Sequence, residues 1–205
     1  MEIKSSSRIA RVISTIFVPP SFTLILFTYF AFHFETDLSK KIILILVSFL
    51  FGFLFHILLF IYFKSKGKLI DLDATIKEER TIPFILSEII YLIGFIILTL
   101  NNINLISIAF WFCYISNTFI VVLINKNWKI SVHAMGASGP LAILVYLFGP
   151  IGGIFFMIPF VVGWSRIKLK CHTFSQVMIG ALFGFVSTYL QILLIVKYFS
   201  YDKIF

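Results

Sequence analysis

Long runs of apolar residues alternate with short polar segments along this chain. A helix that crosses a membrane needs about 20 consecutive and mainly apolar residues. Five runs have this length, and a sixth run, residues 130–164, is too long to be a single helix. The five runs that predict one spanning helix each are residues 9–34, 42–63, 82–100, 103–124 and 173–199.

Proline and glycine interrupt two of these runs. Pro19 and Pro20 predict a kink in the first helix. Residues 149–153, Gly-Pro-Ile-Gly-Gly, predict a break that leaves two short helices of about 24 Å each at 1.5 Å per residue. The pattern therefore predicts an all-α, polytopic transmembrane helical bundle with six to seven spanning helices. No polar stretch is long enough for a second domain, so residues 1–205 are predicted to form a single integral-membrane domain.

The composition agrees with a membrane protein, since 60% of the residues are hydrophobic, 13% are charged and the mean hydropathy is +1.04. Soluble domains carry roughly 25% charged residues. Membrane lipids are therefore the expected surroundings, and a nucleic acid is not an expected partner. Residues 1–11 are basic, but the apolar run after them is too long for a signal peptide and has no small-residue cleavage site. It is interpreted as a retained helix.

Basic residues are distributed unequally between the two ends of the predicted bundle. With seven helices, the loops 64–81, 125–129 and 166–172 share a side with the N-terminus. That side holds 13 of the 17 Lys and Arg residues, and the opposite side holds Lys40, Lys41, Lys197 and Lys203. Because an excess of Lys and Arg marks the cytoplasmic side, the N-terminus and these three loops of a multi-pass protein are predicted to face the cytoplasm.

Polar residues that are capable of chemistry gather in the same three loops. An arginine such as Arg166 offers a planar fork of donors that matches a phosphate group, and His172 offers a nucleophile or a general acid. His172 and Gln176 are four residues apart, so they share one helix face, and the glutamine carbonyl can accept the ring N–H. The candidate residues, in chain order, are Lys77, Arg80, Ser131, His133, Arg166, His172 and Gln176.

Other residues with reactive side chains are interpreted as structural. The spacing of Asp71 and Asp73 does not match the aspartate-rich motif of prenyltransferases, so a solvated acidic turn is expected. His56 is expected to be a packing residue. Cys113 and Cys171 match no disulfide or zinc pattern.

Residues 165–176 resemble a signature of the type-2 phosphatidic acid phosphatase superfamily, which shares its core with vanadium haloperoxidases. That signature is SRxxxxxHxxxD. Ser165, Arg166 and His172 match it at full spacing, and Gln176 stands in the place of the aspartate. By motif order and helix placement, the resemblance covers roughly residues 72–184.

Two further signatures of that family are matched in part. PSGH appears as Ile-Ser-Val-His, which keeps Ser131 and His133. KxxxxxxRP is represented by Arg80, but no proline follows directly, and the residue seven positions earlier is Asp73 instead of lysine. Lys77 is interpreted as a substitute for that lysine.

The resemblance implies a phosphatase mechanism that needs no metal ion and no cofactor. His172 attacks the phosphorus to form a phosphohistidine, and His133 protonates the leaving oxygen as a general acid. Water then cleaves the phosphoenzyme. The groups that hold the phosphate oxygens and neutralise charge in the transition state are Arg80, Arg166, Lys77 and Ser131.

The predicted function is hydrolysis of a lipid phosphate, either a phosphomonoester or a diphosphate, on a glycerolipid or a polyprenyl chain. Gln176 separates this chain from the family pattern, because a neutral amide orients an imidazole without stabilising its positive charge. Two alternatives therefore stay open: a non-hydrolytic relative that binds or transports phospholipids, and a lipid phosphotransferase with an acceptor other than water. Many enzymes of this family face outward, whereas the loop charge here predicts a cytoplasmic site.

Overall fold

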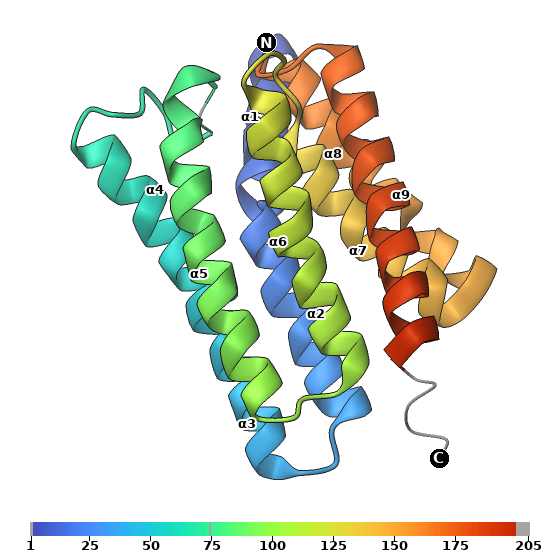
Figure 1. Cartoon of the computed structure of the whole chain (residues 1–205). Coiled ribbons are helices and arrows are strands. Elements are labelled where there is room, and N and C mark those ends of the chain that lie inside the picture. Colours follow the sequence, from blue (N-terminus) through green and yellow to red (C-terminus); the bar gives the residue numbers. More distant parts are fainter. Residues whose placement is uncertain (1, 74, 200–205) are drawn as a thin grey trace.

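The computed structural model describes residues 2–73 and 75–199, with side chains described from residue 6 onwards. Every regular element within these residues is a helix (Figure 1). In chain order they are α1 (Glu2–Ile16), α2 (Pro19–Phe34), α3 (Leu38–Val47), the π-helix η1 (Ser48–Leu54), α4 (Phe55–Ser65), the 3-10 helix η2 (Glu78–Arg80), α5 (Thr81–Leu100), α6 (Leu105–Asn125), α7 (Val132–Phe148), the 3-10 helix η3 (Gly149–Phe156), α8 (Met157–Lys168) and α9 (Phe174–Phe199).

The helices have the length and hydropathy that a membrane protein requires. Within the described residues, five continuous helical segments are long and apolar enough to cross a membrane: Leu38–Ser65, Glu78–Leu100, Leu105–Asn125, Val132–Lys168 and Phe174–Phe199. A sixth span results if the bent pair of α1 and α2 counts as one. The predicted all-helical class is therefore confirmed, and the number of helices that qualify is five or six.

Both interruptions that proline and glycine predicted are present. α1 and α2 meet at an angle of 50°, and Pro19 occupies the first position of α2. α7 ends at Phe148, and Gly149 follows with φ +60°, a value that glycine adopts readily. Gly152 then allows close contact, since a Cβ there would lie 2.3 Å from the Leu144 carbonyl oxygen.

The break at Gly149 reverses the chain direction, so that α8 returns along α7 to the end of the bundle where α7 begins (Figure 1). α8 has 12 residues and is therefore about 18 Å long at 1.5 Å per residue, which is short for an independent span. Because α7, η3 and α8 follow one another without a gap, Val132–Lys168 counts as one candidate span, although the sequence pattern predicted two helices within it.

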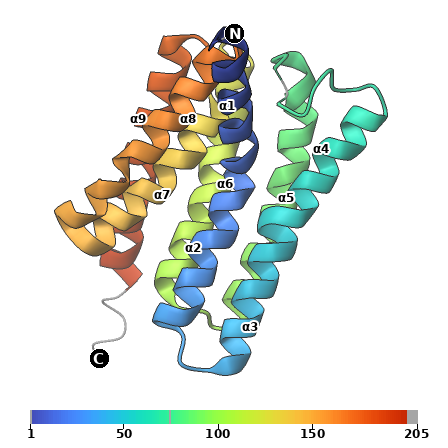
Figure 2. The same cartoon turned by 180° about the vertical axis from the view of Figure 1, so that it is seen from behind.

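The bend at Pro19 also positions the N-terminal helix. α1 leans away from α2 and packs along α8 (Figure 2). The N-terminus, the α6–α7 connection and the α8–α9 connection consequently lie at one end of the bundle. The loops that the sequence assigned to one side are thus found together.

An aromatic cluster forms the core between α2, α5 and α6. The rings of Phe27 and Trp111 meet edge to face with centroids 5.2 Å apart, and Trp111 Nε1 donates to the Tyr91 carbonyl oxygen at 2.8 Å. Gly94 is required beside them, because a Cβ there would lie 2.3 Å from the Trp111 ring. The core thereby fixes the spacing of α5 and α6.

Two glycines set the position of α9 against α7. A Cβ at Gly180 would lie 2.6 Å from the Ser131 carbonyl oxygen, and one at Gly184 would lie 2.5 Å from that of Met135. Small residues four apart allow the backbones of two helices to approach closely. At the same contact, the Ser131 N–H donates to the Gln176 carbonyl oxygen at 3.2 Å. The start of α9 is therefore held beside the start of α7.

We expect Gly180→Leu to destabilise the protein, because the new side chain meets backbone atoms of α7 that cannot move aside. Overpacking of this kind costs about 1–3 kcal/mol. The apparent melting temperature of the purified protein in detergent should fall. Gly153→Leu is the matched control, since no atom lies within 4 Å of a Cβ at that position. An equal loss of stability in both variants would contradict the packing argument.

Candidate functional site

A cavity of about 600 Å³ lies between α1, α2, α4, α5, α6 and α7. Its walls are largely apolar and include Phe60, Phe84, Val121 and Met135. From Arg80, the residue before α5, the lining extends to Tyr91, eleven residues further along, which is about 16 Å at 1.5 Å per residue. The charged and histidine residues that line it are Arg11, His56, Lys64, Asp71, Asp73, Arg80, His133 and His172.

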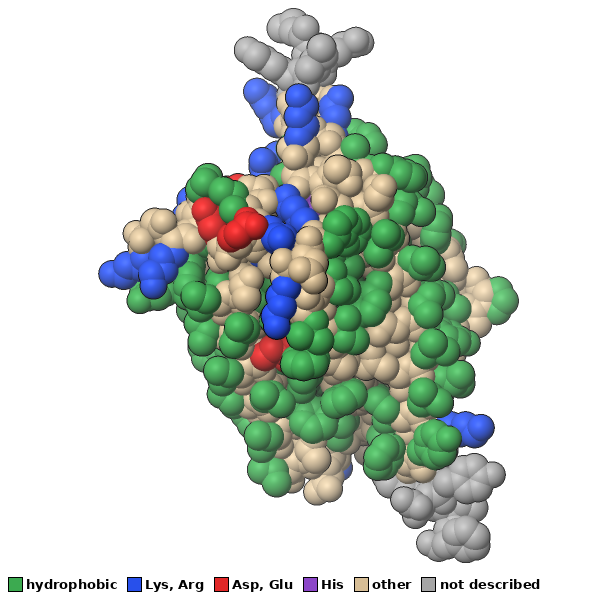
Figure 3. All heavy atoms as spheres, turned by 45° about the horizontal axis from the view of Figure 1, so that its top comes forward, with side chains coloured by type: hydrophobic (Ala, Val, Ile, Leu, Met, Phe, Trp, Pro, Cys, Tyr) green, Lys and Arg blue, Asp and Glu red, His purple; other side chains and the backbone are tan. Residues whose placement is uncertain are grey.

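The polar end of the cavity coincides with the basic end of the molecule. Lys and Arg side chains gather at the end of the bundle that carries the N-terminus, together with a few acidic side chains (Figure 3). A site lined by cations at one end and by apolar side chains along its length suits an anionic group that carries an apolar tail.

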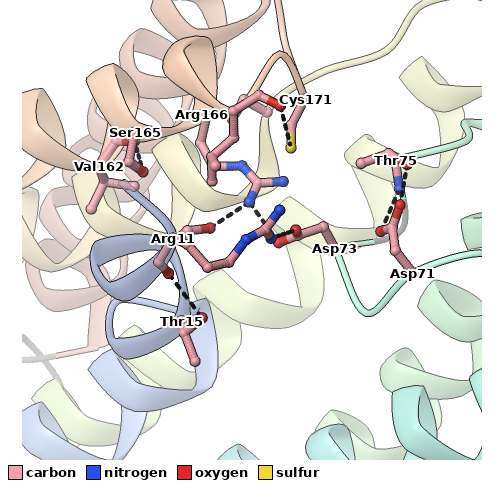
Figure 4. A network of polar contacts seen from close by, with 12 residues as sticks. Arg11, Thr15, Asp71, Asp73, Thr75, Val162, Ser165, Arg166 and Cys171 are labelled. Carbon is pink, nitrogen blue, oxygen red and sulfur yellow. Dashed lines mark hydrogen bonds and ion pairs between the residues drawn. The ribbon is translucent and has the colours of Figure 1, made fainter. Parts of the chain in front are cut away.

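Arg166 is the most deeply buried cation of the site. Its side chain is 0% exposed and lies in the last turn of α8, where the helix dipole favours a positive charge. Its Nη1 donates to Ser14 Oγ on α1 and to Asp73 Oδ1 at 2.6 Å (Figure 4). Its Nε and Nη2 are buried and make no hydrogen bond to any residue that the structure describes. Two donors of a buried guanidinium are thus left for an acceptor.

Asp73 is held between two arginines. Its second carboxylate oxygen pairs with Arg11 of α1, so that the two oxygens bridge α1 and α8 (Figure 4). Burial raises the pKa of Asp73, but the charge of Arg166 and its hydrogen bond outweigh burial and lower the pKa overall. The expectation of a solvated turn is therefore wrong for Asp73, whose side chain is only 14% exposed. Distant helices supply its partners, 62 and 93 residues away in sequence.

Arg80 is fixed by the neighbouring helix and loop. Its Nε donates to Asn125 Oδ1 at 2.7 Å, and its Nη2 donates to the Ile130 carbonyl oxygen at 3.2 Å. Asn125 in turn donates to the Lys77 carbonyl oxygen at 2.8 Å. The guanidinium also lies over the Phe84 ring, 5.6 Å from its centroid. Arg80 is therefore a rigid, buried cation in the wall of the cavity.

His172 and Gln176 make the contact that the helical spacing predicted, with Nδ1 and Oε1 3.2 Å apart. The same oxygen accepts the Thr173 N–H at 3.1 Å, and the Gln176 N–H donates to Thr173 Oγ1 at 3.3 Å. This reciprocal pair is a capping box at the start of α9. Because the amide oxygen only accepts, the Nδ1 atom of His172 carries the hydrogen and Nε2 keeps its lone pair.

The environment of His172 keeps the imidazole neutral. Burial lowers its pKa to about 3, and the positive charges of Lys129, Arg166 and Arg80 contribute, whereas the hydrogen bond to Gln176 acts in the opposite direction. A neutral ring is the form that can act as a nucleophile. Burial and the charge of Arg80 also lower the pKa of Lys129, whose Nζ donates to the Cys171 carbonyl oxygen at 2.6 Å.

His133 and Ser131 occupy the start of α7. His133 lines the cavity, and its Nε2 is buried with no hydrogen-bond partner among the described residues. Ser131 is fully buried and caps the helix, since its Oγ accepts the Ala134 N–H at 3.4 Å. It is not among the residues that line the cavity, although the sequence suggested it as a phosphate ligand.

Lys77 also lies apart from the cavity. Its Nζ donates to the Lys126 carbonyl oxygen at 3.0 Å and lies 3.7 Å from Glu78 Oε1. It thereby joins two loops at the basic end of the bundle. In this arrangement Arg80, His133 and His172 line the cavity, and Arg166 adjoins it through its ion pair with Asp73. Lys77 and Ser131 lie outside the lining and bond to the surrounding backbone.

Sequence reasoning missed the contribution of the N-terminal helix. Arg11 and Ser14 reach the site from α1, and Asn125 orients Arg80 from α6. In the sequence, Arg11 counted only as one of the 13 basic residues on the side of the N-terminus. The one local signal was the spacing of Arg11 and Ser14, which places two polar side chains on the same face of a helix.

No protein-family model, no curated protein sequence and no solved structure matches this chain. The resemblance to type-2 phosphatidic acid phosphatases therefore rests on Ser165, Arg166, His172 and the partial signatures around Arg80 and His133.

Proposed function

We propose that this protein is an integral-membrane, metal-independent lipid phosphatase that acts through a phosphohistidine intermediate. The observation that carries the proposal is the buried Arg166 guanidinium, which has two donor atoms without an acceptor and pairs with Asp73, a residue that lines the polar end of a cavity with apolar walls. A phosphate group supplies the acceptors, and a lipid tail matches the walls.

Two histidines provide the chemistry that hydrolysis needs. The Nε2 atom of His172 attacks the phosphorus, and the bond from phosphorus to the leaving oxygen breaks. His133 transfers a proton to that oxygen, and its neutral imidazole then takes a proton from the water that attacks the phosphorus, while the bond from phosphorus to Nε2 of His172 breaks. Arg80 and Arg166 neutralise the charge that develops on the phosphoryl oxygens. After hydrolysis, free phosphate leaves and His172 regains its lone pair.

The sequence supports the same proposal and gives it an orientation. The spacing of Ser165, Arg166 and His172 is that of a phosphatase signature. The loop charge favours a topology in which the α6–α7 and α8–α9 connections, and with them the site, face the cytoplasm. Glycerolipid phosphates and polyprenyl mono- or diphosphates both fit an anionic head with an apolar tail.

A second candidate function is non-hydrolytic binding or transport of a lipid phosphate. Two observations favour it: Gln176 provides no carboxylate for the imidazolium, and Asp73 places a negative charge in the site. A phosphotransferase differs from a phosphatase only in the acceptor that attacks the phosphoenzyme.

Release of inorganic phosphate from purified protein decides between these functions. The panel contains a glycerolipid phosphate, a polyprenyl phosphate and a polyprenyl diphosphate in mixed micelles, with and without a chelator. We expect release from at least one lipid, and the rate should be unchanged by the chelator. Binding of the lipids without release, in the presence or absence of lipid acceptors, would favour the non-hydrolytic function. Loss in the chelator and recovery with a divalent ion would contradict the metal-independent mechanism.

We expect Gln176→Glu to raise the rate of phosphate release by about tenfold or more, because a carboxylate stabilises the imidazolium that an amide only orients. Glutamate keeps the chain length that the capping box requires, whereas Gln176→Asp is one methylene shorter. Ser175→Glu is the control, since it adds the same charge at an exposed neighbouring position. Equal effects of the two glutamates would show that net charge, not contact with His172, is responsible.

A further inference from the structure

Asp73 receives the same kind of contacts that a phosphate oxygen would receive. Arg11 of α1 and Arg166 of α8 each bind one carboxylate oxygen (Figure 4). Ser14 binds the same Nη1 atom of Arg166. Guanidinium groups pair with carboxylates and phosphates through the same planar geometry, so these donors do not distinguish the two anions.

The position of Asp73 makes it a competitor for the ligand. Asp73, His133 and His172 all line the polar end of the cavity. Arg166 is not among the lining residues, and it contacts the lining through Ser14 and Asp73. A phosphate that approaches Arg166 from the cavity therefore comes next to the Asp73 carboxylate, which is bound to Nη1 of the guanidinium. Two anions at one guanidinium repel each other, and binding of the phosphate favours departure of the carboxylate.

The chain around Asp73 allows this exchange without loss of a helix. Asp73 lies in the irregular segment between α4 and η2. The segment is fastened separately, because Asp71 accepts hydrogen bonds from the Thr75 N–H and hydroxyl, and Glu79 accepts the Ile70 N–H at 2.9 Å. Movement of the Asp73 side chain breaks its two ion pairs and leaves these turns in place.

We propose that Arg11, Ser14 and Arg166 form a binding site for phosphoryl oxygens, and that Asp73 occupies this site until a ligand phosphate displaces it. The inference rests on the proposed function and adds a form of regulation to it, because the Asp73 carboxylate fills the phosphate site when no ligand is bound. Arg166 is thereby kept paired in the absence of lipid, and a weakly charged ligand is a poor competitor for the site.

The test is binding of radiolabelled inorganic phosphate to the purified, full-length protein in detergent. Asp73→Asn keeps the shape of the side chain and removes its charge. Only molecules in which Asp73 has left the site can bind phosphate, so removal of this competitor raises the apparent affinity by the inverse of their fraction. We expect about tenfold tighter binding, which corresponds to about one molecule in ten with an open site. Asp71→Asn is the matched control, because it removes the same charge from a neighbouring residue that also lines the cavity. The described hydrogen bonds of the Asp71 carboxylate go to Thr75 and to neither arginine. Equal gains in both variants, or no gain in Asp73→Asn, would overturn the proposal.

Hydrogen–deuterium exchange of the unmodified protein provides a measurement that does not depend on a variant. Displacement of Asp73 should increase exchange of the amides of Leu72 and Asp73 when phosphate is added, while the hydrogen-bonded amides of Ile70 and Thr75 and the helices α5 and α6 stay unchanged. Slower exchange at Leu72 and Asp73 would mean that phosphate binds with Asp73 in place. If the wild-type protein hydrolyses lipid phosphates but Asp73→Asn binds phosphate no more tightly, only this inference fails. If neither protein binds or hydrolyses, the proposed function fails as well.

Discussion

His172→Ala should reduce phosphate release to the background rate. His172 is the proposed nucleophile, and His133, the other histidine at the polar end of the cavity, is already assigned to proton transfer. Loss of a catalytic nucleophile in hydrolases costs on the order of 10⁴-fold or more in turnover. The measurement is initial phosphate release under the conditions of the lipid panel.

Two controls separate this result from misfolding. His33→Ala removes an exposed histidine in the last turn of α2, away from the cavity, and should keep wild-type activity. The His172→Ala protein should elute and melt like the wild type, because alanine leaves the capping pair of Thr173 and Gln176 intact. A labelled, acid-labile phosphoenzyme should form on the wild type and be absent from His172→Ala. Retained activity in a folded His172→Ala protein would exclude the phosphohistidine mechanism.

Arg166→Lys should lower kcat/KM by about 10²–10³-fold, the usual cost of removing one donor to a developing oxyanion. The lysine keeps the charge but has a single ammonium group, which cannot bind Ser14 and Asp73 and also present two donors to a ligand. The loss should appear for every lipid that the wild type accepts, since the missing contacts are to the phosphate. Steady-state kinetics on a short-chain lipid phosphate measures it.

Arg8→Lys is the matched control for this substitution. It makes the same chemical change at an exposed position of α1, one turn before Arg11. We expect its kinetics to equal those of the wild type. If Arg166→Lys retained kcat/KM within about threefold, the fork of donors would be unnecessary, and Arg166 would serve mainly as the partner of Asp73.

The sequence determined the features that depend on near neighbours in the chain. Apolar runs of sufficient length predicted the helices, because each spanning helix must satisfy its own backbone hydrogen bonds and cover them with apolar side chains. Pro19 and Gly149 predicted the bend and the reversal, since both act on the backbone where they stand. The contact between His172 and Gln176 followed from a spacing of four residues.

The number of spans was less certain from the pattern alone. Glycine and proline indicate where a helix ends, but they do not give the angle between the two parts, which is 50° for α1 and α2. Six to seven spanning helices were predicted, and five or six qualify within the described residues. The close approach at Gly180, which fixes α9 on α7, became visible only when both helices were in place.

Only the tertiary structure decided which charges form the site. Arg11 and Arg166 are far apart in sequence and meet because the bend at Pro19 lays α1 along α8, where both reach Asp73. Lys77, in contrast, bonds the Lys126 carbonyl oxygen and lies outside the cavity lining, although it had been interpreted as a substitute for the lysine of the phosphatase signature. A buried charge must find a partner to offset its loss of hydration, and that partner is chosen by proximity in space. Charge and spacing along the chain do not contain that information, which arises from the angles at which the helices pack.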